Sequence, residues 1–206
     1  MPAIPTESFA QLIAEIRACT RCAAELPLGA RPIVRGRPSA LLLIVSQAPG
    51  TRVHETGLSF NDRSGDRLRD WLGLDRETFY DEAQIAIMGV GFCYPGRDAS
   101  GGDRPPLRCC APLWHPRLRP HFTAVELTLL VGSYAVRHYL PQTRGMPMGA
   151  VLPHWREFLP EYLVLPHPSW RTTHWQRSNP WFEAELLPEL RRRVGAVVAT
   201  PHLPVH

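Results

Sequence analysis

Short apolar runs recur along the chain, and each one ends in polar or turn-forming residues. Four of them stand out, at residues 41–45, 85–88, 127–131 and 162–165. Apolar runs of four or five residues bounded by turn signals are typical of strands buried on both faces of a parallel sheet. Helical patterns fill the intervals, and strands alternating with helices indicate an α/β fold. We therefore expect a three-layer α/β/α sandwich around a central four-stranded parallel sheet.

Capping signals mark the ends of the predicted helices. The stretch Ser8–Gln11 is a capping box that opens the first helix. Ser64 is expected to cap a further helix, which Gly73 ends. Asn179–Pro180 supplies a cap and a first-turn proline for the last helix, and Pro188 should kink or split that helix.

The carboxyl ends of the four predicted strands lead into loops rich in small and polar residues. These loops lie at residues 47–50, 89–93, 132–133 and 167–169. Carboxyl ends of parallel strands share one edge of the sheet, and ligands bind at this edge in open α/β folds. We expect the four loops to line one site. The stretch after the first strand, with Gln47, His54 and then Asp62, would form one wall of it.

Length and composition suit one globular domain. The chain has 206 residues, of which 44% are hydrophobic, and this is enough for a core. We expect a single domain over residues 1–206, with the N-terminal helix and the Cys19–Cys22 segment packed on it. No apolar run approaches the roughly 18–20 residues of a membrane span, and the first ten residues lack a secretory pattern. These features favour a cytoplasmic monomer without membrane contact.

The basic residues are unusual, because all 23 are arginine and none is lysine. The planar fork of arginine suits phosphate recognition, although a GC-rich genome that favours arginine codons is the main explanation of the bias. The net charge of +4 is modest. In either case the chain offers no lysine amine for a Schiff base.

Five cysteines suggest a metal site. Cys19 and Cys22 form a C-x2-C pair, and Cys93 precedes Cys109 by 15 intervening residues, with Cys110 as an alternative to Cys109. Four thiolates from two distant pairs suit an iron–sulfur cluster or a zinc ion. Ordinary burial of small side chains is the other explanation. A thioredoxin-like redox pair fits less well, because its C-x-x-C follows a strand and opens a helix.

Six short motifs follow one another along the chain. They are C-x2-C, S-Q-A-P-G at 46–50, G-L-S-F at 57–60, S-G-x-x-L at 64–68, C-x15-C and H-P-S at 167–169. This ordered set resembles the uracil-DNA glycosylase superfamily, and is closest to its iron–sulfur branches, families four and five. The resemblance runs from about residue 12 to residue 190. It implies a 4Fe–4S cluster held by Cys19, Cys22, Cys93 and Cys109, with zinc or no cofactor as alternatives, and DNA with a deaminated base as the partner.

The resemblance also implies roles for single residues. Gln47 and Ala48 belong to a turn that places amides near the base and the attacking water, and Gln47 replaces the glutamate of family four. Phe60 would stack on the flipped base. Asp62 matches the proposed catalytic acid of family five, and His167 would contact the base carbonyl. The predicted catalytic residues are therefore Asp62, His167 and Gln47.

Recognition of the base is where the chain departs from the family. Family four reads the uracil edge with an asparagine, and this chain has Gly89 there. Asn61 is a conceivable substitute; otherwise the backbone reads the base, or the preferred base is hypoxanthine or xanthine. Gly89 favours the last of these, because the loss of a side chain would enlarge the pocket floor. The loop with Ser169, Trp170 and Arg171 is predicted to wedge into the duplex and to contact phosphate.

The predicted function is a monofunctional DNA glycosylase for uracil or a related deaminated base, acting in base excision repair. Such an enzyme flips the base out of the stack and hydrolyses its N-glycosidic bond. Three alternatives stay open: a hypoxanthine or xanthine glycosylase, a non-catalytic binder of damaged DNA, and a thiol redox or zinc-interaction protein. The site residues have structural explanations too: Asp62 as a helix cap, Gln47 as a turn partner, Phe60 as core, and His54 and Trp170 as surface residues.

Overall fold

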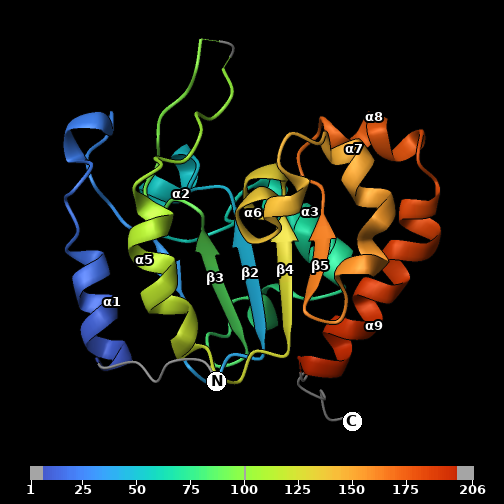
Figure 1. Cartoon of the computed structure of the whole chain (residues 1–206), viewed down its shortest axis with the longest axis horizontal. Helices are drawn as coiled ribbons and strands as arrows, with labels where there is room; N and C mark the ends of the chain where they lie inside the picture. The colour runs from blue at the N-terminus through green and yellow to red at the C-terminus, as the bar shows by residue number, and fades with distance from the viewer. Residues whose placement is uncertain (1–6, 100, 199–206) are drawn as a thin grey trace.

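The computed structural model of the chain describes residues 7–99 and 101–198. Its centre is a five-stranded sheet in the order β1-β3-β2-β4-β5. The strands are β1 (Val34–Arg35), β2 (Leu42–Ser46), β3 (Ile85–Gly89), β4 (Leu127–Val131) and β5 (Tyr162–Leu165). The four predicted strands are present as β2 to β5, and all their pairings are parallel. Their carboxyl ends therefore meet at one edge, at the top of Figure 1.

The expectation of a four-stranded sheet was one strand short. β1 pairs with β3 in the antiparallel direction, with Val34 opposite Met88. At two residues β1 is too short to leave a recognisable pattern of apolar positions. β2 occupies the centre, with Ile44 opposite Ile87 of β3 and Leu129 of β4. All three side chains are almost fully buried, which explains the unbroken apolar runs.

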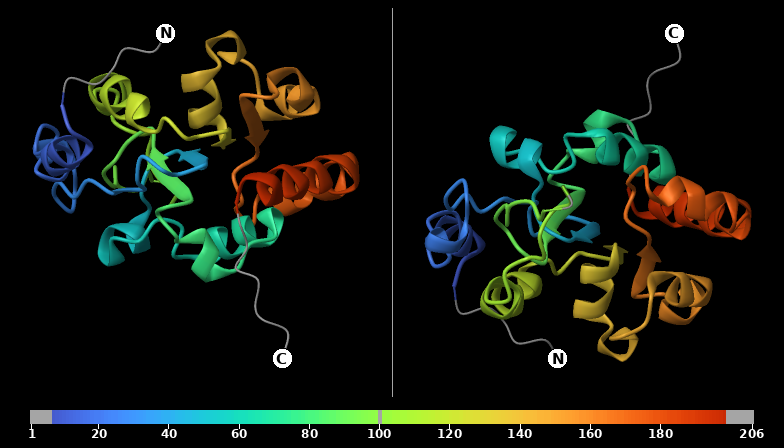
Figure 2. Two further views of the ribbon diagram at one scale, coloured as in Figure 1. Left: turned by 90° about the horizontal axis from the view of Figure 1, so that it is seen from below. Right: turned by 90° about the horizontal axis from the view of Figure 1, so that it is seen from above.

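Helices cover both faces of the sheet, with α5 and α6 on one face and α3 and α9 on the other (Figure 2). No helix in the described ranges is both long and apolar enough to span a bilayer. The α-helices are α1 (Phe9–Arg17), α2 (Thr51–Thr56), α3 (Arg63–Leu72), α4 (Arg76–Phe79), α5 (Cys110–Leu118), α6 (Ser133–Tyr139), α7 (Met148–Val151), α8 (Thr172–Arg177) and α9 (Leu187–Val197). Shorter helical turns are η1 (Ala23–Glu25), η2 (Arg119–His121), η3 (Pro141–Thr143), η4 (Leu152–Phe158) and the π-helix η5 (Phe182–Leu186).

The predicted helix ends are mostly where the sequence indicates. Ser8 caps α1 in a complete capping box, and Gly73 ends α3 in the left-handed conformation. The expectation that Ser64 caps α3 was wrong, because Asp62 does so. Its carboxylate accepts the Gly65 N–H at 2.9 Å, and Ser64 already lies inside the first turn. The last helix is split as predicted: the π-helix η5 precedes α9, which has Pro188 in its first turn.

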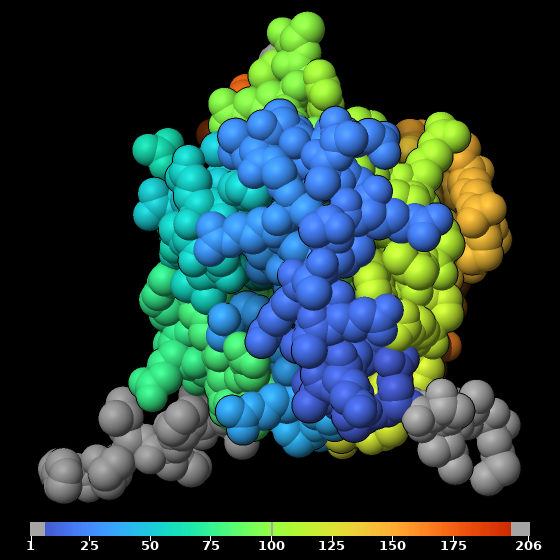
Figure 3. Space-filling model, turned by 90° about the vertical axis from the view of Figure 1, so that its left-hand side faces the viewer, coloured from blue at the N-terminus to red at the C-terminus, as the bar shows by residue number. Residues whose placement is uncertain are grey.

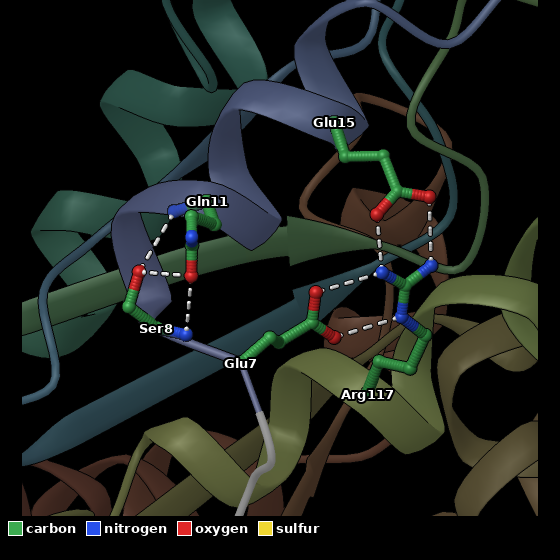
Figure 4. Close-up of polar contacts among 5 residues, drawn as sticks. All are labelled: Glu7, Ser8, Gln11, Glu15 and Arg117. Atoms are coloured by element: carbon green, nitrogen blue, oxygen red, sulfur yellow. Dashed lines mark hydrogen bonds and ion pairs between the residues drawn. The ribbon is translucent and has the colours of Figure 1, made fainter.

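The N-terminal helix is fastened to α5 by one arginine (Figure 4). Arg117 forms ion pairs with Glu7 and Glu15, which stand before and on α1. Its guanidinium also lies 5.0 Å from the ring centre of Trp114. In Figure 3 the N-terminal segment covers one side of the molecule beside α5. These contacts bring the Cys19–Cys22 segment close to the start of α5.

Candidate functional site

A pocket of about 640 Å³, partly open to solvent, lies at the carboxyl edge of the sheet. We call it the polar pocket. Residues from the ends of β2 and β3, from the start of α3 and from the loop after β5 contribute to it. Six of its lining residues matter for the chemistry considered below: Gln47, Ala48, Phe60, Asp62, Asp103 and His167. Five of these six are residues that the sequence predicted to act together.

The turn after β2 forms one wall of the polar pocket. The carbonyl of Gln47 accepts the Gly91 N–H at 3.0 Å, so the turn is tied to the end of β3. The side-chain amide of Gln47 donates to the Arg104 carbonyl at 3.1 Å. Gln47 therefore holds a loop between β3 and α5 in addition to lining the pocket.

Gly89 ends β3 beside this turn, where the backbone packs too tightly for a side chain. A Cβ atom there would lie 2.3 Å from the Gly91 carbonyl oxygen and 3.2 Å from the Cα atom of Ala48. The idea that Gly89 widens the pocket floor is therefore wrong, because the space is filled by backbone. The carbonyl of Gly89 is 2.9 Å from Nε2 of the buried His115, whose Nδ1 is 2.9 Å from the Tyr139 hydroxyl.

Phe60 and Asp62 enter the polar pocket from the segment before α3. Phe60 adopts a left-handed backbone conformation with φ 56°, which is rare for an aromatic residue and is found at constrained sites. A Cβ on Gly65 would lie only 1.7 Å from the Phe60 carbonyl oxygen, so this packing requires glycine. Asp62 lines the pocket while one of its oxygens caps α3. Asp62 can therefore serve both as the cap of α3 and as a carboxylate of the pocket.

Two residues of this region are not brought into the pocket. The side-chain oxygen of Asn61 accepts a hydrogen bond from Arg76 at 2.9 Å, and its carbonyl accepts one from Arg52. The prediction that Asn61 contacts the base thus has no support from its position. His54 lies on α2 with its ring 6.0 Å from that of Tyr94, and it does not line the polar pocket.

His167 follows β5 and projects into the polar pocket. The side chain of His167 is exposed to solvent. It nevertheless lies in a cleft, with protein around it. This surrounding protein lowers the pKa of His167, and the carboxylates of Asp62 and Asp103 oppose the shift. The ring is therefore neutral at pH 7 and can donate a hydrogen bond from only one nitrogen. A Cβ on Gly132 would lie 3.5 Å from that of His167, which places the ends of β4 and β5 side by side.

The loop after His167 carries the predicted DNA-binding residues. Trp170 is 79% exposed, an unusual state for a tryptophan, and the Arg171 guanidinium lies 5.7 Å from its ring centre. Arg67 of α3 holds this loop by donating to the Ser169 carbonyl at 2.7 Å and to the Thr173 hydroxyl at 3.0 Å. Arg67 was missed in the sequence, because its partners are about a hundred residues away.

Asp103 is the second residue that the sequence did not indicate. It sits on the loop between β3 and α5, where it lines the polar pocket and is exposed to solvent. Desolvation raises the pKa of its carboxyl above the ordinary value, while Arg97 and His167 oppose the shift. No periodic pattern covers this loop, and only its tertiary position reveals it.

A second cavity is lined by all five cysteines and by apolar side chains such as Leu26, Leu113 and Trp114. We call it the cysteine cavity. The sulfur atoms of Cys22 and Cys109 are 2.7 Å apart, which is longer than the roughly 2.05 Å of a disulfide, and all five cysteines are free. Cys19–Cys22 and Cys109 come from segments that Arg117 holds together.

The geometry distinguishes Cys109 from Cys110. Cys110 accepts the Phe92 N–H at 3.3 Å, and burial raises the pKa of its thiol to about 12. Cys109 instead faces Cys22, whose thiol pKa is also raised to about 12, mainly by burial. Within residues 7–99 and 101–198, no three His, Cys, Asp or Glu side chains converge on the position of a single ion. The five thiols nevertheless line one cavity together.

An α/β fold with a polar pocket at the carboxyl ends of its parallel strands defines a class of ligand-binding and catalytic domains. The profile of the Uracil DNA glycosylase superfamily matches residues 33–191. The chain therefore belongs to this superfamily. The match includes the whole polar pocket, and it begins after α1 and the Cys19–Cys22 pair.

Proposed function

We propose that the protein is a monofunctional DNA glycosylase that hydrolyses the N-glycosidic bond of uracil, or of a related deaminated base, in DNA. One observation carries this proposal: Phe60, Asp62 and His167 meet in one pocket beside the exposed Trp170. Membership of the Uracil DNA glycosylase superfamily supports glycosylase chemistry.

The pocket offers what this reaction requires on its two sides. Cleavage of the bond builds positive charge on the sugar and negative charge on the departing base. The carboxylate of Asp62 would stabilise the sugar cation. The neutral ring of His167 and the backbone amides near Ala48 would donate to the base, and each such donor contributes about 2.7–4 kcal/mol in comparable sites.

The loop after β5 would open the duplex. Trp170, at 79% exposure, has the size and position of a wedge that enters the base stack. Arg171 beside it would contact a backbone phosphate. The expelled base would then stack on Phe60 in the polar pocket.

The nucleophile in this scheme is water. Glycosylases that also cut the strand commonly form a Schiff base with an amine, and this chain has no lysine. The product is therefore an intact strand with an abasic site.

Cys19, Cys22, Cys93 and Cys109 would hold a 4Fe–4S cluster in the cysteine cavity. The donor set of four thiols and the apolar surroundings fit this group. Its contribution would be structural, because it would join the end of α1 to the loop after β3 and to the start of α5.

The test is base release from single- and double-stranded oligonucleotides that carry uracil, hypoxanthine or xanthine. Abasic product is detected by alkaline cleavage, and we expect release of at least one base without strand scission before alkali. Scission by the pure protein alone would contradict the monofunctional mechanism. Tight binding to damaged DNA without any release would favour the non-catalytic alternative.

A further inference from the structure

The loop between β3 and α5 places the carboxylate of Asp103 in the lining of the polar pocket. It projects from the carboxyl edge of the sheet at the top of Figure 1. Arg97 and Asp103 form an isolated antiparallel bridge at its base, and Asp98 N–H donates to the Gly102 carbonyl at 2.8 Å. Asp103 thus has a backbone fixed on both sides, and its side chain lines the pocket.

Gln47, in the turn after β2, sets the position of this loop through its side chain. Its side-chain amide donates to the carbonyl of Arg104, the residue that follows Asp103, at 3.1 Å. The Arg104 N–H in turn donates to the Gly96 carbonyl at 2.9 Å. Gln47 carries no charge, and its amide is engaged in this contact. The neighbouring Asp103 supplies the negative charge on the same wall.

Asp103 stands close to the groups that would act on the substrate. One of its carboxylate oxygens lies 3.4 Å from where a Cβ on Gly50 would be, next to the turn after β2. His167 and Asp62 both interact with it electrostatically, as do Arg97 and Asp98. One oxygen of Asp62 is engaged at the α3 cap. Because that oxygen of Asp62 is engaged, Asp103 is the better placed of the two to accept a proton in the pocket, and its own raised pKa suits this role.

We propose that Asp103 is a catalytic carboxylate that accepts a proton from the attacking water, and that Gln47 is the residue that positions it. This inference rests on the proposed glycosylase function. The water oxygen bonds to C1′ of the sugar as the C1′–N bond breaks, and one water proton passes to Asp103. The bonding pair leaves with the base as an anion, which accepts a hydrogen bond from His167 and then takes a proton from solvent. The carboxylate of Asp62 stabilises the sugar cation, so the two carboxylates have separate roles.

Asp103→Asn tests the proposal in single-turnover measurements, on the oligonucleotide from which the wild type releases most base. We expect the rate to fall about 100-fold, in the range of general-base contributions, with unchanged affinity for the same DNA. Glu126→Gln is the control. It removes one exposed carboxylate just before β4, at the opposite edge of the sheet, and Glu126 lines neither the polar pocket nor the cysteine cavity. Its rate should stay within about twofold of the wild type.

A double-mutant cycle tests the positioning role of Gln47. The single variant Gln47→Ala should release base about tenfold more slowly than the wild type. The double variant should be almost as fast as Asp103→Asn alone, because the effects of residues that act as a unit are not additive. Fully additive effects would overturn the positioning role. Equal rates for the wild type and Asp103→Asn would overturn the catalytic role of Asp103 and leave the glycosylase function intact. No release by the wild type from any substrate would overturn both proposals.

Discussion

The cysteine cavity and the polar pocket are both lined by the short segment 89–93, but their linings differ in chemical character. Residues 91–93 line the cysteine cavity, and Gly89 lines the polar pocket. The first cavity is apolar, and burial raises the thiol pKa of Cys22 and Cys110. The second reaches solvent and contains two carboxylates and an imidazole.

This difference suits the cysteine cavity to a role in stability and the polar pocket to a role in the chemistry. Buried thiols with a raised pKa stay protonated unless a positive centre binds them, so the cysteine cavity is suited to a bound group that holds segments together. The polar pocket keeps its ionisable groups near water, where they can exchange protons with a substrate. Changes in the first cavity should therefore mainly affect folding, and changes in the second should mainly affect rate.

The largest effect is expected for Cys22→Ser. Loss of one of the four proposed ligands should prevent binding of the proposed cluster and lower the melting temperature by more than ten degrees, because the binding free energy of a structural metal group is folding free energy. Iron and sulfide analysis with calorimetry would measure both. Cys110→Ser is the matched control, since serine can still accept the Phe92 N–H, and it should keep the iron. Equal iron content in the two variants would contradict the assignment of Cys22.

His167→Ala should show the opposite behaviour. We expect base release to slow by about 10²–10³-fold, the usual effect of losing one such donor, with the melting temperature nearly unchanged. His154→Ala is the control, because His154 is an exposed histidine on η4 that pairs only with Glu157 among the residues described. A wild-type rate in His167→Ala would remove this residue from the mechanism.

Much of this arrangement could be predicted from the sequence because it depends on local patterns. The run at 85–88 is apolar at every position, so it indicated β3, and Ser8 and Gln11 are three residues apart. The carboxyl edge followed from the parallel order of the strands. Arg67 and Asp103 could not be found in this way. Arg67 contacts residues more than a hundred positions away, and Asp103 lies on a loop without periodicity.

Gly89 shows a different limit of sequence analysis. A glycine can leave space in a pocket, or it can allow two backbone segments to pack closely. In a sequence both cases look the same, because both are a missing side chain. Only the 2.3 Å approach of the Gly91 carbonyl to the Cβ position distinguishes them. Asp62 shows a similar ambiguity. It stands directly before α3, and from this one position it both caps the helix and lines the pocket, so the sequence alone does not separate the two roles.

His115 connects the two cavities and should make stability depend on pH. Burial lowers its pKa to about 4, and its ring is stacked on Phe92 and bonded to Gly89. Below about pH 6.5 the unfolded chain binds a proton that the folded protein excludes, so the free energy of unfolding should fall by ~3 kcal/mol between pH 6.5 and 4. The pKa of His138 is lowered too and acts in the same direction. Urea unfolding at a series of pH values would measure this.

The matched variant for this test is His115→Gln, which cannot titrate and can still donate to the Gly89 carbonyl. Its stability should depend less steeply on pH in the same window, whatever its stability at pH 7. Identical pH slopes in the two proteins would show that His115 does not cause the effect. Since the ring holds Gly89, a slower rate of base release in this variant would also link the two cavities.

The smallest effect separates the two roles of Asp62. Asparagine caps helices as well as aspartate does, so Asp62→Asn should keep the stability of the wild type and lose only the negative charge in the pocket. Asp62→Ala should lose the charge and also about 1 kcal/mol of unfolding free energy, because the Gly65 N–H loses its partner. Both variants should therefore release base more slowly than the wild type, and to a similar extent, while urea unfolding distinguishes them. If Asp62→Asn released base at the wild-type rate, Asp62 would be a cap alone, and Asp103 would be left as the carboxylate of the polar pocket.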